Sequence, residues 1–206
     1  MLTHTAGGRE LVFVHIPKTA GLSVWKIVGR PHGVSNRLTH ATVAQWRQGL
    51  GAARYDAAFS FAIVRHPCDR LLSAWSYLHG QKPGDRYYGP DTPERLQIAR
   101  YGETFNEFAL SMPKWMVRPS GGMVHFVSQA DYLCVDGQPR VNRLLRFERL
   151  DIGWLLLMDE CGAALLELPV TNRSRHGDWR DVVSADSERR IRELYADDFS
   201  LFYPGE

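Results

Sequence analysis

The chain has 206 residues, of which 44% are hydrophobic, and its formal net charge is +2. This length and composition suit one domain with an ordinary hydrophobic core, so residues 1–206 are predicted to form a single domain. The nearly balanced charge excludes nucleic-acid binding through bulk positive charge, and any basic site has to be local.

The first segment with a clear pattern is predicted to be a buried strand followed by an anion-binding loop. Leu11–Ile16 is apolar at nearly every position, which is typical of a central parallel strand. Residues 17–21 read Pro-Lys-Thr-Ala-Gly, and a helix is predicted over Leu22–Val28. Amide groups at a helix start and the helix dipole attract anions, and Lys18 adds a positive charge. The segment therefore predicts a phosphate site.

A second strand and helix follow the first. Thr39 is the predicted N-cap of a helix over Ala41–Gly49, and Phe59–Val64 is predicted to be a second buried strand. That strand ends at Arg-His-Pro, residues 65–67, and a helix is predicted over Asp69–His79. Strands that alternate with helices indicate an α/β fold with a parallel sheet, whose ligands bind at the carboxyl ends of the strands.

The remaining two thirds of the chain are less regular. A capping box at Thr104 predicts a short helix to Ser111. Two strands are predicted over Asp131–Val135 and Leu144–Phe147, around an Asp136-Gly137 turn. Further helices are predicted over Pro93–Tyr101, over Leu150–Cys161, and from Ser184 or Asp186 to Tyr195, with long loops over Gln81–Pro93, Met112–Gly122 and Leu168–His176.

The cysteines and the absence of a targeting pattern bear on the compartment. Cys68, Cys134 and Cys161 are odd in number and widely spaced, so they indicate neither a disulfide framework nor a zinc site. No signal-peptide pattern precedes the first strand, and no run reaches the ~18 apolar residues of a membrane span. We therefore expect a cytoplasmic protein without a membrane span.

The order of residues in the first loop separates two kinds of phosphate site. The loop of ATP-dependent phosphotransferases reads G-x-x-x-x-G-K-[ST], with the lysine after a glycine and a hydroxyl on magnesium. Here Lys18 precedes Gly21, and no aspartate stands in a second-motif setting that would hold a metal. The sequence therefore disfavours an ATP-dependent phosphotransferase and predicts no metal site. That enzyme stays an alternative, as does a non-catalytic nucleotide-binding module.

A second anion site is predicted after the second strand. Arg65 stands at the carboxyl end of that strand, and it is expected beside the first loop if the two strands are neighbours. Ser73 lies about two helical turns further on. An arginine and a serine that converge on one anion suit a second phosphate, separate from the first.

At these two segments the chain resembles the sulfotransferases that use 3′-phosphoadenosine 5′-phosphosulfate (PAPS), in the branch of the heparan and chondroitin enzymes and their bacterial relatives. His15–Ser23 is similar to the family's 5′-phosphosulfate loop, and Val64–Trp75 is similar to its 3′-phosphate segment. Phe147–Leu150, Leu168–Ser174 and Tyr195–Phe199 resemble later family segments, in the same order. The resemblance implies a central parallel sheet flanked by helices, in a P-loop-like nucleotide-binding architecture.

The resemblance also implies which residues bind the nucleotide. Arg65 and Ser73 would hold the 3′-phosphate, and a late loop would close over the nucleotide. Leu22 stands where the family usually has a small hydroxyl residue, and His66-Pro67-Cys68 stands where asparagine and an aromatic are usual. The implied contacts are Pro17, Lys18, Thr19, Ala20, Gly21, Leu22, Ser23, Arg65, Ser73, Arg173 and Ser174.

The implied reaction is sulfuryl transfer from PAPS to a hydroxyl or amine, with PAP as the product. Lys18 would neutralise the charge that develops on the leaving phosphate oxygen, without a metal. A hydroxyl acceptor needs a general base, and His40 is the candidate because the family often has a similar His-Ala-Thr element there. His15 is expected to be a buried structural histidine.

The acceptor is expected to be a carbohydrate or a small hydroxylated metabolite. Trp115 and Trp179 fall in predicted loops, so they are the candidates for stacking on such an acceptor. The chain is short for the family, and a homodimer or another partner could complete the acceptor pocket.

Overall fold

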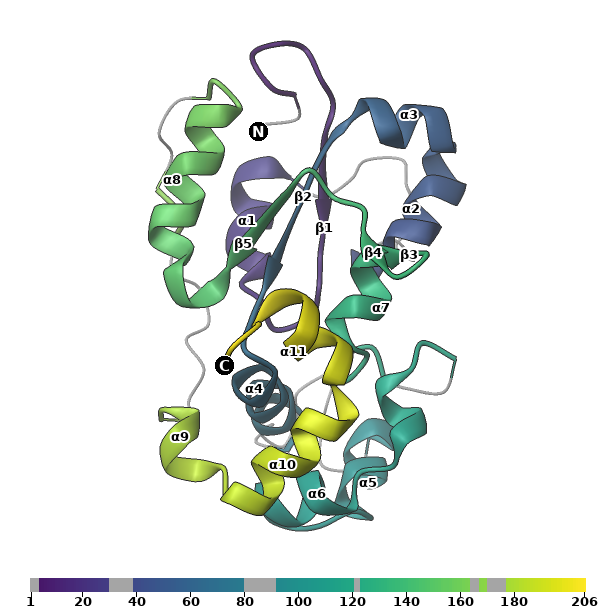
Figure 1. Ribbon diagram of the computed structural model, residues 1–206, viewed down its shortest axis with the longest axis vertical. Coiled ribbons are helices and arrows are strands. Elements are labelled where there is room, and N and C mark those ends of the chain that lie inside the picture. The colour runs from purple at the N-terminus through teal and green to yellow at the C-terminus, as the bar shows by residue number, and fades with distance from the viewer. Residues whose placement is uncertain (1–3, 30–38, 80–91, 121–122, 164–166, 170–176) are drawn as a thin grey trace. The chain divides into compact units, whose positions relative to one another are not determined.

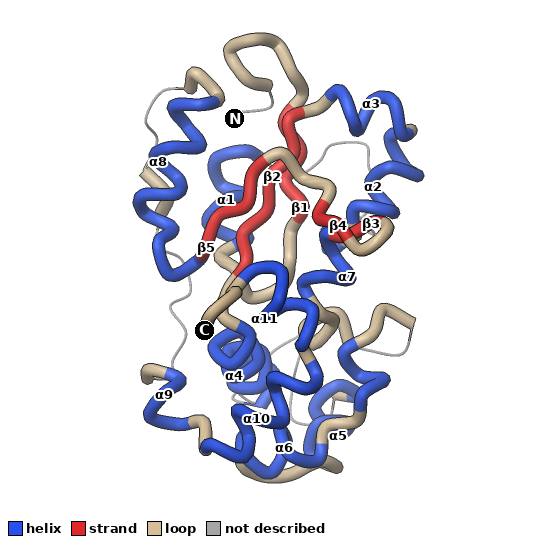
Figure 2. The backbone as a smooth tube through the Cα atoms, in the orientation of Figure 1, coloured by secondary structure: helices blue, strands red, loops and turns tan. Residues whose placement is uncertain are grey.

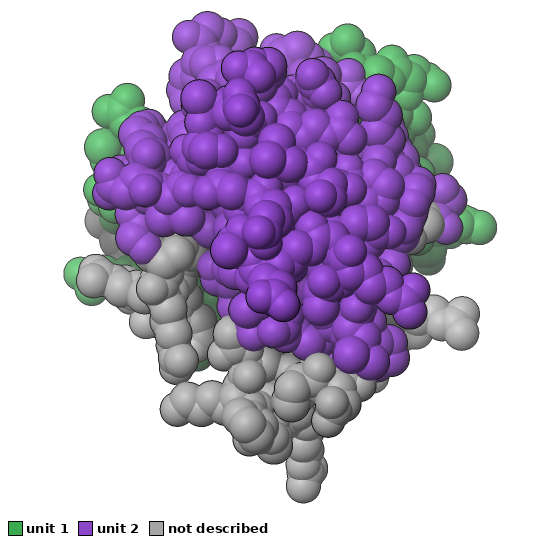
Figure 3. Space-filling view, turned by 90° about the horizontal axis from the view of Figure 1, so that it is seen from below, with its two compact units in different colours: residues 1–65, 129–172 green, residues 66–128, 173–206 purple. Residues whose placement is uncertain are grey.

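The structure is a computed structural model, and it describes residues 4–29, 39–79, 92–120, 123–163, 167–169 and 177–206 (Figure 1). The chain divides into two compact units, residues 1–65 with 129–172 and residues 66–128 with 173–206 (Figure 3). The first unit holds the main sheet, and the second is helical. A single domain over residues 1–206 stays a prediction.

The first unit is built on a parallel sheet of three strands. The strands are β1 (Leu11–Val14), β2 (Phe59–Val64) and β5 (Arg143–Arg146), in the order β1-β2-β5, and both pairings are parallel (Figure 2). All six residues of the central β2 are buried. A strand covered on both faces is largely apolar, and five of the six residues of β2 are apolar, with Ser60 the exception, so this pattern made the strand predictable. The predicted α/β fold is confirmed.

Two helices cover one face of this sheet. Helix α1 (Gly21–Val28) and helix α8 (Leu150–Glu160) share a buried cluster with side chains of all three strands. Phe61 lies at its centre, with ring centroids 4.9 Å from Phe13 and 6.3 Å from Trp154. Burial of each large side chain stabilises the fold by about 1.5–3 kcal/mol, so this cluster holds β1 and the start of α1 in place.

The helix before β2 starts later than predicted. Helix α2 (Val43–Leu50) has Thr42 as its N-cap, because the Thr42 hydroxyl accepts from the Gln45 amide and the Gln45 side chain accepts from the Thr42 amide. The predicted cap at Thr39 is wrong, since the residue three positions after Thr39 is another threonine and cannot complete such a box. A short helix that was not predicted, α3 (Ala52–Ala57), follows α2.

The predicted hairpin has a different partner strand. Strand β3 (Cys134–Val135) pairs antiparallel with β4 (Gln138–Pro139) around the Asp136-Gly137 turn, whose residues have φ of 53° and 72°. A two-residue turn of this kind joins only the residues that flank it. The predicted pairing with Leu144–Phe147 is therefore wrong, and β5 lies parallel to β2 instead. The start of the predicted first strand is helix α7 (Gln129–Leu133).

The second unit contains helices only, among its described residues. Its predicted Thr104 capping box is confirmed, with Thr104 and Glu107 each accepting from the other's amide. Ser184, rather than Asp186, caps the penultimate helix. The helices are α4 (Pro67–His79), α5 (Pro93–Ala99), α6 (Phe105–Ser111), the 3-10 helix η2 (Lys114–Val117), α9 (Trp179–Val182), α10 (Ala185–Leu194) and α11 (Ala196–Phe202).

Candidate functional site

The loop between β1 and α1 has the backbone conformation of an anion site. Lys18 and Ala20 have left-handed φ values of 71° and 66°. Left-handed residues in a tight loop turn amide N–H groups toward one side, where they form a concave site for an anion. The first turn of α1 contains no acidic residue, and the start of a helix attracts anions. The backbone predicted to bind phosphate therefore has the necessary shape.

Some side chains of the loop and of the first turn of α1 are buried, and others are exposed. Thr19 is fully buried, and its hydroxyl donates to the Ile16 carbonyl at 2.8 Å, so its proton is engaged within the loop. Ser23 is also buried, whereas the Leu22 side chain is 46% exposed. Hydroxyl donors are therefore scarce here, and the backbone amides are the main neutral donors of the loop.

Gly21 is required by packing and not by its backbone angles. A Cβ at this position would lie 1.7 Å from the His15 Nε2 atom and 2.2 Å from its Cδ2 atom. The His15 ring is itself buried, at 7% exposure. The absence of a side chain at Gly21 thus lets the first turn of α1 lie directly against the His15 imidazole.

The surroundings of Lys18 disfavour the charged form of its amine. Burial, and next the nearby Arg65 guanidinium, lower the pKa of Lys18 to about 8. Both causes penalise the charged amine, and a bound anion would relieve both. A lysine of this kind stabilises negative charge strongly once a ligand has displaced water.

Arg65 is brought to the loop by the pairing of β1 with β2. Its Nη1 donates to the Lys18 carbonyl at 3.1 Å, and its guanidinium carbon lies 4.2 Å from the centroid of the Phe147 ring. The Gln129 side chain bonds both the amide and the carbonyl of Arg65, each at 2.9 Å. Arg65 is only 5% exposed, so the guanidinium is held in one orientation. The expected meeting of Arg65 with the first loop is confirmed.

Gln129 is a positioning residue that sequence reasoning missed. It lies 64 residues after Arg65 in the chain, and no local pattern marks it. Phe147 belongs to a segment that resembles the family, but its stacking with Arg65 is visible only in the tertiary structure.

His40 lies beside the loop, just before α2. Its ring centroid is 4.5 Å from that of His15, with 42° between the ring planes. Burial lowers the pKa of His40 below its ordinary value of 6.5, and a hydrogen bond to the backbone of His15 opposes this shift in part. The lowered pKa favours the neutral imidazole, whose lone pair can accept a proton.

Other predicted site residues belong to the second unit or lie outside the described residues. Ser73 is buried on α4, at 2% exposure. Trp179 stacks on His66, with centroids 4.4 Å apart and 11° between planes, and Trp115 is 44% exposed. Arg173 and Ser174 lie outside the described residues. The roles of Ser73, Arg173 and Ser174 stay predictions.

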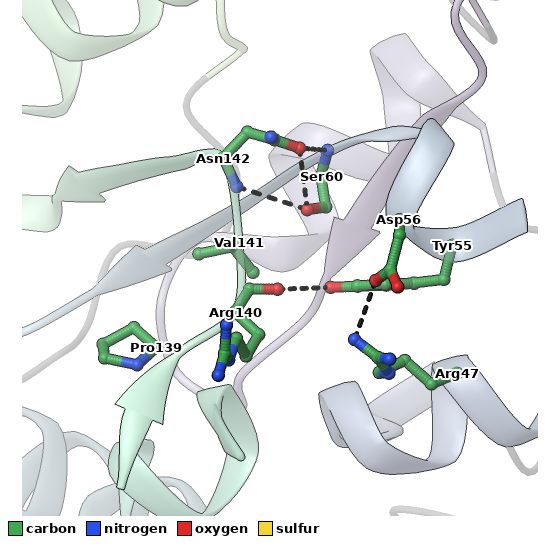
Figure 4. Close-up of a pocket in the computed structure, with 8 residues that line it drawn as sticks. All are labelled: Arg47, Tyr55, Asp56, Ser60, Pro139, Arg140, Val141 and Asn142. Atoms are coloured by element: carbon green, nitrogen blue, oxygen red, sulfur yellow. Dashed lines mark hydrogen bonds and ion pairs between the residues drawn. The ribbon is translucent and has the colours of Figure 1, made fainter. Parts of the chain in front are cut away.

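A recess of about 310 Å³ in the first unit lies away from this loop (Figure 4). It is lined by residues next to the amino ends of β2 and β5, where Asn142 accepts from both the amide and the hydroxyl of Ser60. The Tyr55 hydroxyl donates to the Arg140 carbonyl across it. Ligands of parallel sheets bind at the carboxyl ends, so we do not assign this recess to the function.

In a comparison with protein-family models, the chain matches the sulfotransferase family over residues 3–204. The chain belongs to the sulfotransferase family. Searches of curated proteins and of solved structures found no match. Membership of this family agrees with an anion-binding loop, since sulfotransferases move a sulfuryl group from an anionic donor to an acceptor.

The site of this sulfotransferase is suited to a donor with phosphate groups. The loop amides, the Lys18 amine and the Arg65 guanidinium present donors and positive charge at one place in the first unit. In the part of the chain that the structure describes, no group of three or more His, Cys, Asp or Glu side chains could hold a metal ion. No described helix has both the length and the apolar character to cross a bilayer.

Proposed function

We propose that this sulfotransferase transfers the sulfuryl group of PAPS to a hydroxyl or amine of a carbohydrate or small metabolite and releases PAP. The observation that supports it most is the Arg65 guanidinium against the Lys18 carbonyl of a left-handed loop. This arrangement gives the anionic groups of PAPS two cations and a set of amides. No metal enters the proposal, because PAPS already carries a good leaving group.

In this proposal the residues of the first unit divide the work between binding and proton transfer. The loop amides and Lys18 hold the 5′-phosphosulfate, and the ammonium of Lys18 neutralises the charge that grows on the leaving phosphate oxygen. His40 accepts the proton of the acceptor hydroxyl as its oxygen forms the new bond to sulfur and the bond from sulfur to phosphate oxygen breaks. Arg65, Ser73, Arg173 and Ser174 are proposed ligands of the 3′-phosphate, carried over from the resemblance.

Thermal unfolding tests the proposal against the two alternatives. PAP that binds the native state at 100 times its Kd stabilises it by about 2.7 kcal/mol, which raises the Tm by about 5–10 °C. We expect this shift with PAP and none with ATP and magnesium. A shift only with ATP and magnesium would refute the proposal in favour of a phosphotransferase. PAP binding without any cleavage of PAPS would favour a non-catalytic module.

Replacing Arg65 with alanine is expected to raise the Kd for PAP by about tenfold to a hundredfold, because hydrogen bonds to charged groups contribute about 1.5–3 kcal/mol. Isothermal titration calorimetry gives the Kd of each variant directly. The matched control is Arg47→Ala, which removes an arginine that lines the recess at the other end of the sheet. Equal Kd values for the Arg65 and Arg47 variants would contradict a role of Arg65 in binding.

The affinity for PAP is expected to fall as the pH rises through about 8, the pKa of Lys18. A bound anion favours the ammonium and raises its pKa, so the complex takes up a proton above pH 8 but not well below it. The limiting slope is about one decade of Kd per pH unit, for one proton. Calorimetry between about pH 7 and 9.5 avoids titration of the phosphates, whose second pKa is about 6. Lys18→Met should abolish the slope.

A further inference from the structure

The His15 side chain contacts segments of the proposed site in addition to its neighbours in the core. It directly follows β1, its ring is 7% exposed, and a Cβ on Gly21 would overlap the ring. Its Nδ1 lies 3.1 Å from the Thr39 carbonyl and 3.2 Å from the indole nitrogen of Trp25. The imidazole thus touches the first turn of α1, the middle of α1 and the residue before His40.

The two contacts of Nδ1 make different chemical demands. The Thr39 carbonyl can only accept a hydrogen bond, and the Trp25 indole can only donate one. In the tautomer with a proton on Nδ1, this nitrogen donates to the Thr39 carbonyl and anchors the ring to the segment that carries His40. In the other tautomer, Nδ1 accepts from the Trp25 indole and anchors the ring to α1. Stacking against Phe13, with centroids 5.4 Å apart, keeps the ring in place in both cases.

His40 is held by His15 in two further ways. The two imidazole centroids lie 4.5 Å apart, and a hydrogen bond joins His40 to the backbone of His15. The same His15 ring lies under Gly21 of the anion-binding loop. The His15 ring therefore contacts both the loop and the His40 segment, although 25 positions separate the two histidines in the sequence.

We propose that His15 is a positioning residue, whose Nδ1 contacts and ring fix the Thr39–His40 segment relative to the anion-binding loop. This inference rests on the proposed function, in which His40 is the general base. His15 itself touches no reacting atom in this proposal. It acts by holding His40 where its lone pair meets the proton of the acceptor.

A pair of amide substitutions tests this role. In His15→Asn the side-chain amide occupies the place of Nδ1, whereas in His15→Gln it occupies the place of Nε2. Both remove the imidazole and its capacity to titrate, and they differ in which ring nitrogen the amide replaces and in one methylene group. We expect His15→Gln to lower the rate of PAPS cleavage at saturating PAPS by about tenfold to a hundredfold, which is typical of a misplaced catalytic group. His15→Asn should recover most of the rate, and the Kd for PAP should change less than about threefold in both.

Equal rates for the Asn and Gln variants would overturn the proposal, as would a loss of PAP affinity that accounts for the whole loss of rate. Circular dichroism and the Tm without ligand show whether each variant is folded. His15→Ala removes all contacts and serves as the lower limit, and the Asn and Gln pair decides the question if that variant does not fold.

A second measurement separates this inference from the proposed function. The imidazole Cε1–H signal of His40, assigned through a His40→Gln variant, gives the pKa of His40 by NMR without any substrate. We expect a pKa below 6.5 in the wild type and in His15→Asn, and a return toward 6.5 in His15→Gln. An unchanged His40 titration in all three proteins would refute the positioning role. If His40 titrates as expected in all three proteins but none of them cleaves PAPS, the proposed function is refuted and the positioning role of His15 is not.

Discussion

Replacing Lys18 with methionine is expected to lower the turnover number for sulfuryl transfer by about 10²–10³-fold, the usual effect of removing one preorganised donor to a developing oxyanion. The ammonium neutralises charge that grows on the leaving phosphate oxygen, and nearby amides cannot supply a formal charge. Methionine keeps the apolar stem, so packing is retained. Steady-state release of PAP from PAPS, with water or a hydroxyl acceptor, measures the effect.

The same substitution is expected to leave the folded state as stable as before or slightly more stable. Burial and the neighbouring Arg65 both disfavour the Lys18 ammonium in the free protein, so its removal relieves an unfavourable interaction. A large loss of turnover with an unchanged or higher Tm is the signature of a residue retained for function. A lower Tm that parallels the loss of turnover would indicate a structural role instead.

Lys18→Arg is the matched control for charge. It keeps the positive charge but replaces a compact ammonium by a planar guanidinium, which differs in geometry and hydration. We expect it to keep much of the affinity for PAP and to recover only part of the turnover. Full loss of PAP affinity in Lys18→Arg, equal to that of Lys18→Met, would show that the site does not respond to charge and would contradict the assignment.

Replacing Gly21 with alanine is expected to destabilise the protein by about 3 kcal/mol, at the upper end of the usual range for overpacking a buried site. The added Cβ would overlap the buried His15 ring, so the ring or the first turn of α1 has to shift. Urea denaturation, with the slope checked for two-state behaviour, measures the free energy of unfolding.

A double-mutant cycle shows whether the His15 ring is the cause. In the His15→Ala background the added Cβ would meet no ring, so the Gly21→Ala step should cost less than about 1 kcal/mol there. The coupling between the two positions is then about 2 kcal/mol. The same cost in both backgrounds would contradict the steric explanation.

The neighbouring position is expected to respond in the opposite direction. Ala20 has a φ of 66°, a conformation that is unfavourable by about 1–2 kcal/mol for a residue with a Cβ. Ala20→Gly removes this strain but gains freedom in the unfolded chain, so we expect a net stabilisation of up to about 1 kcal/mol, measured by the same urea denaturation. Adjacent small residues therefore have different physical reasons for their size.

Several features of the fold could be predicted from short stretches of sequence. Five of the six buried residues of β2 are apolar, and the Thr104 capping box lies within four consecutive residues. The loop of residues 17–21 and its following helix were also predictable, because a strand, a turn and a helix start are each local patterns. The meeting of Arg65 with the loop followed from these elements, since neighbouring parallel strands end at the same edge.

The predicted strand pairing and the predicted N-cap of α2 were wrong because, in each case, the sequence pattern allowed two alternatives. The hydrophobic pattern of Leu144–Phe147 suits either a hairpin or the main sheet, and pairing with the buried β2 buries more apolar surface than pairing with a two-residue strand. Thr39 and Thr42 are both acceptable caps by residue type, and the glutamine three positions after Thr42 decides between them. These choices depend on interactions that a single residue's propensity does not contain.

The amino-acid sequence was therefore sufficient for the α/β class, the first strand with its loop and helix, and the resemblance to sulfotransferases, because these depend on residues adjacent in the chain. The tertiary structure alone placed Gln129 on the backbone of Arg65, the His15 ring beneath Gly21, and His40 beside His15. The contacts of Arg65 with Gln129 and of His15 with His40 join residues that are far apart in sequence. All three contacts are decided by which packing of the whole unit buries the most surface while satisfying its polar groups.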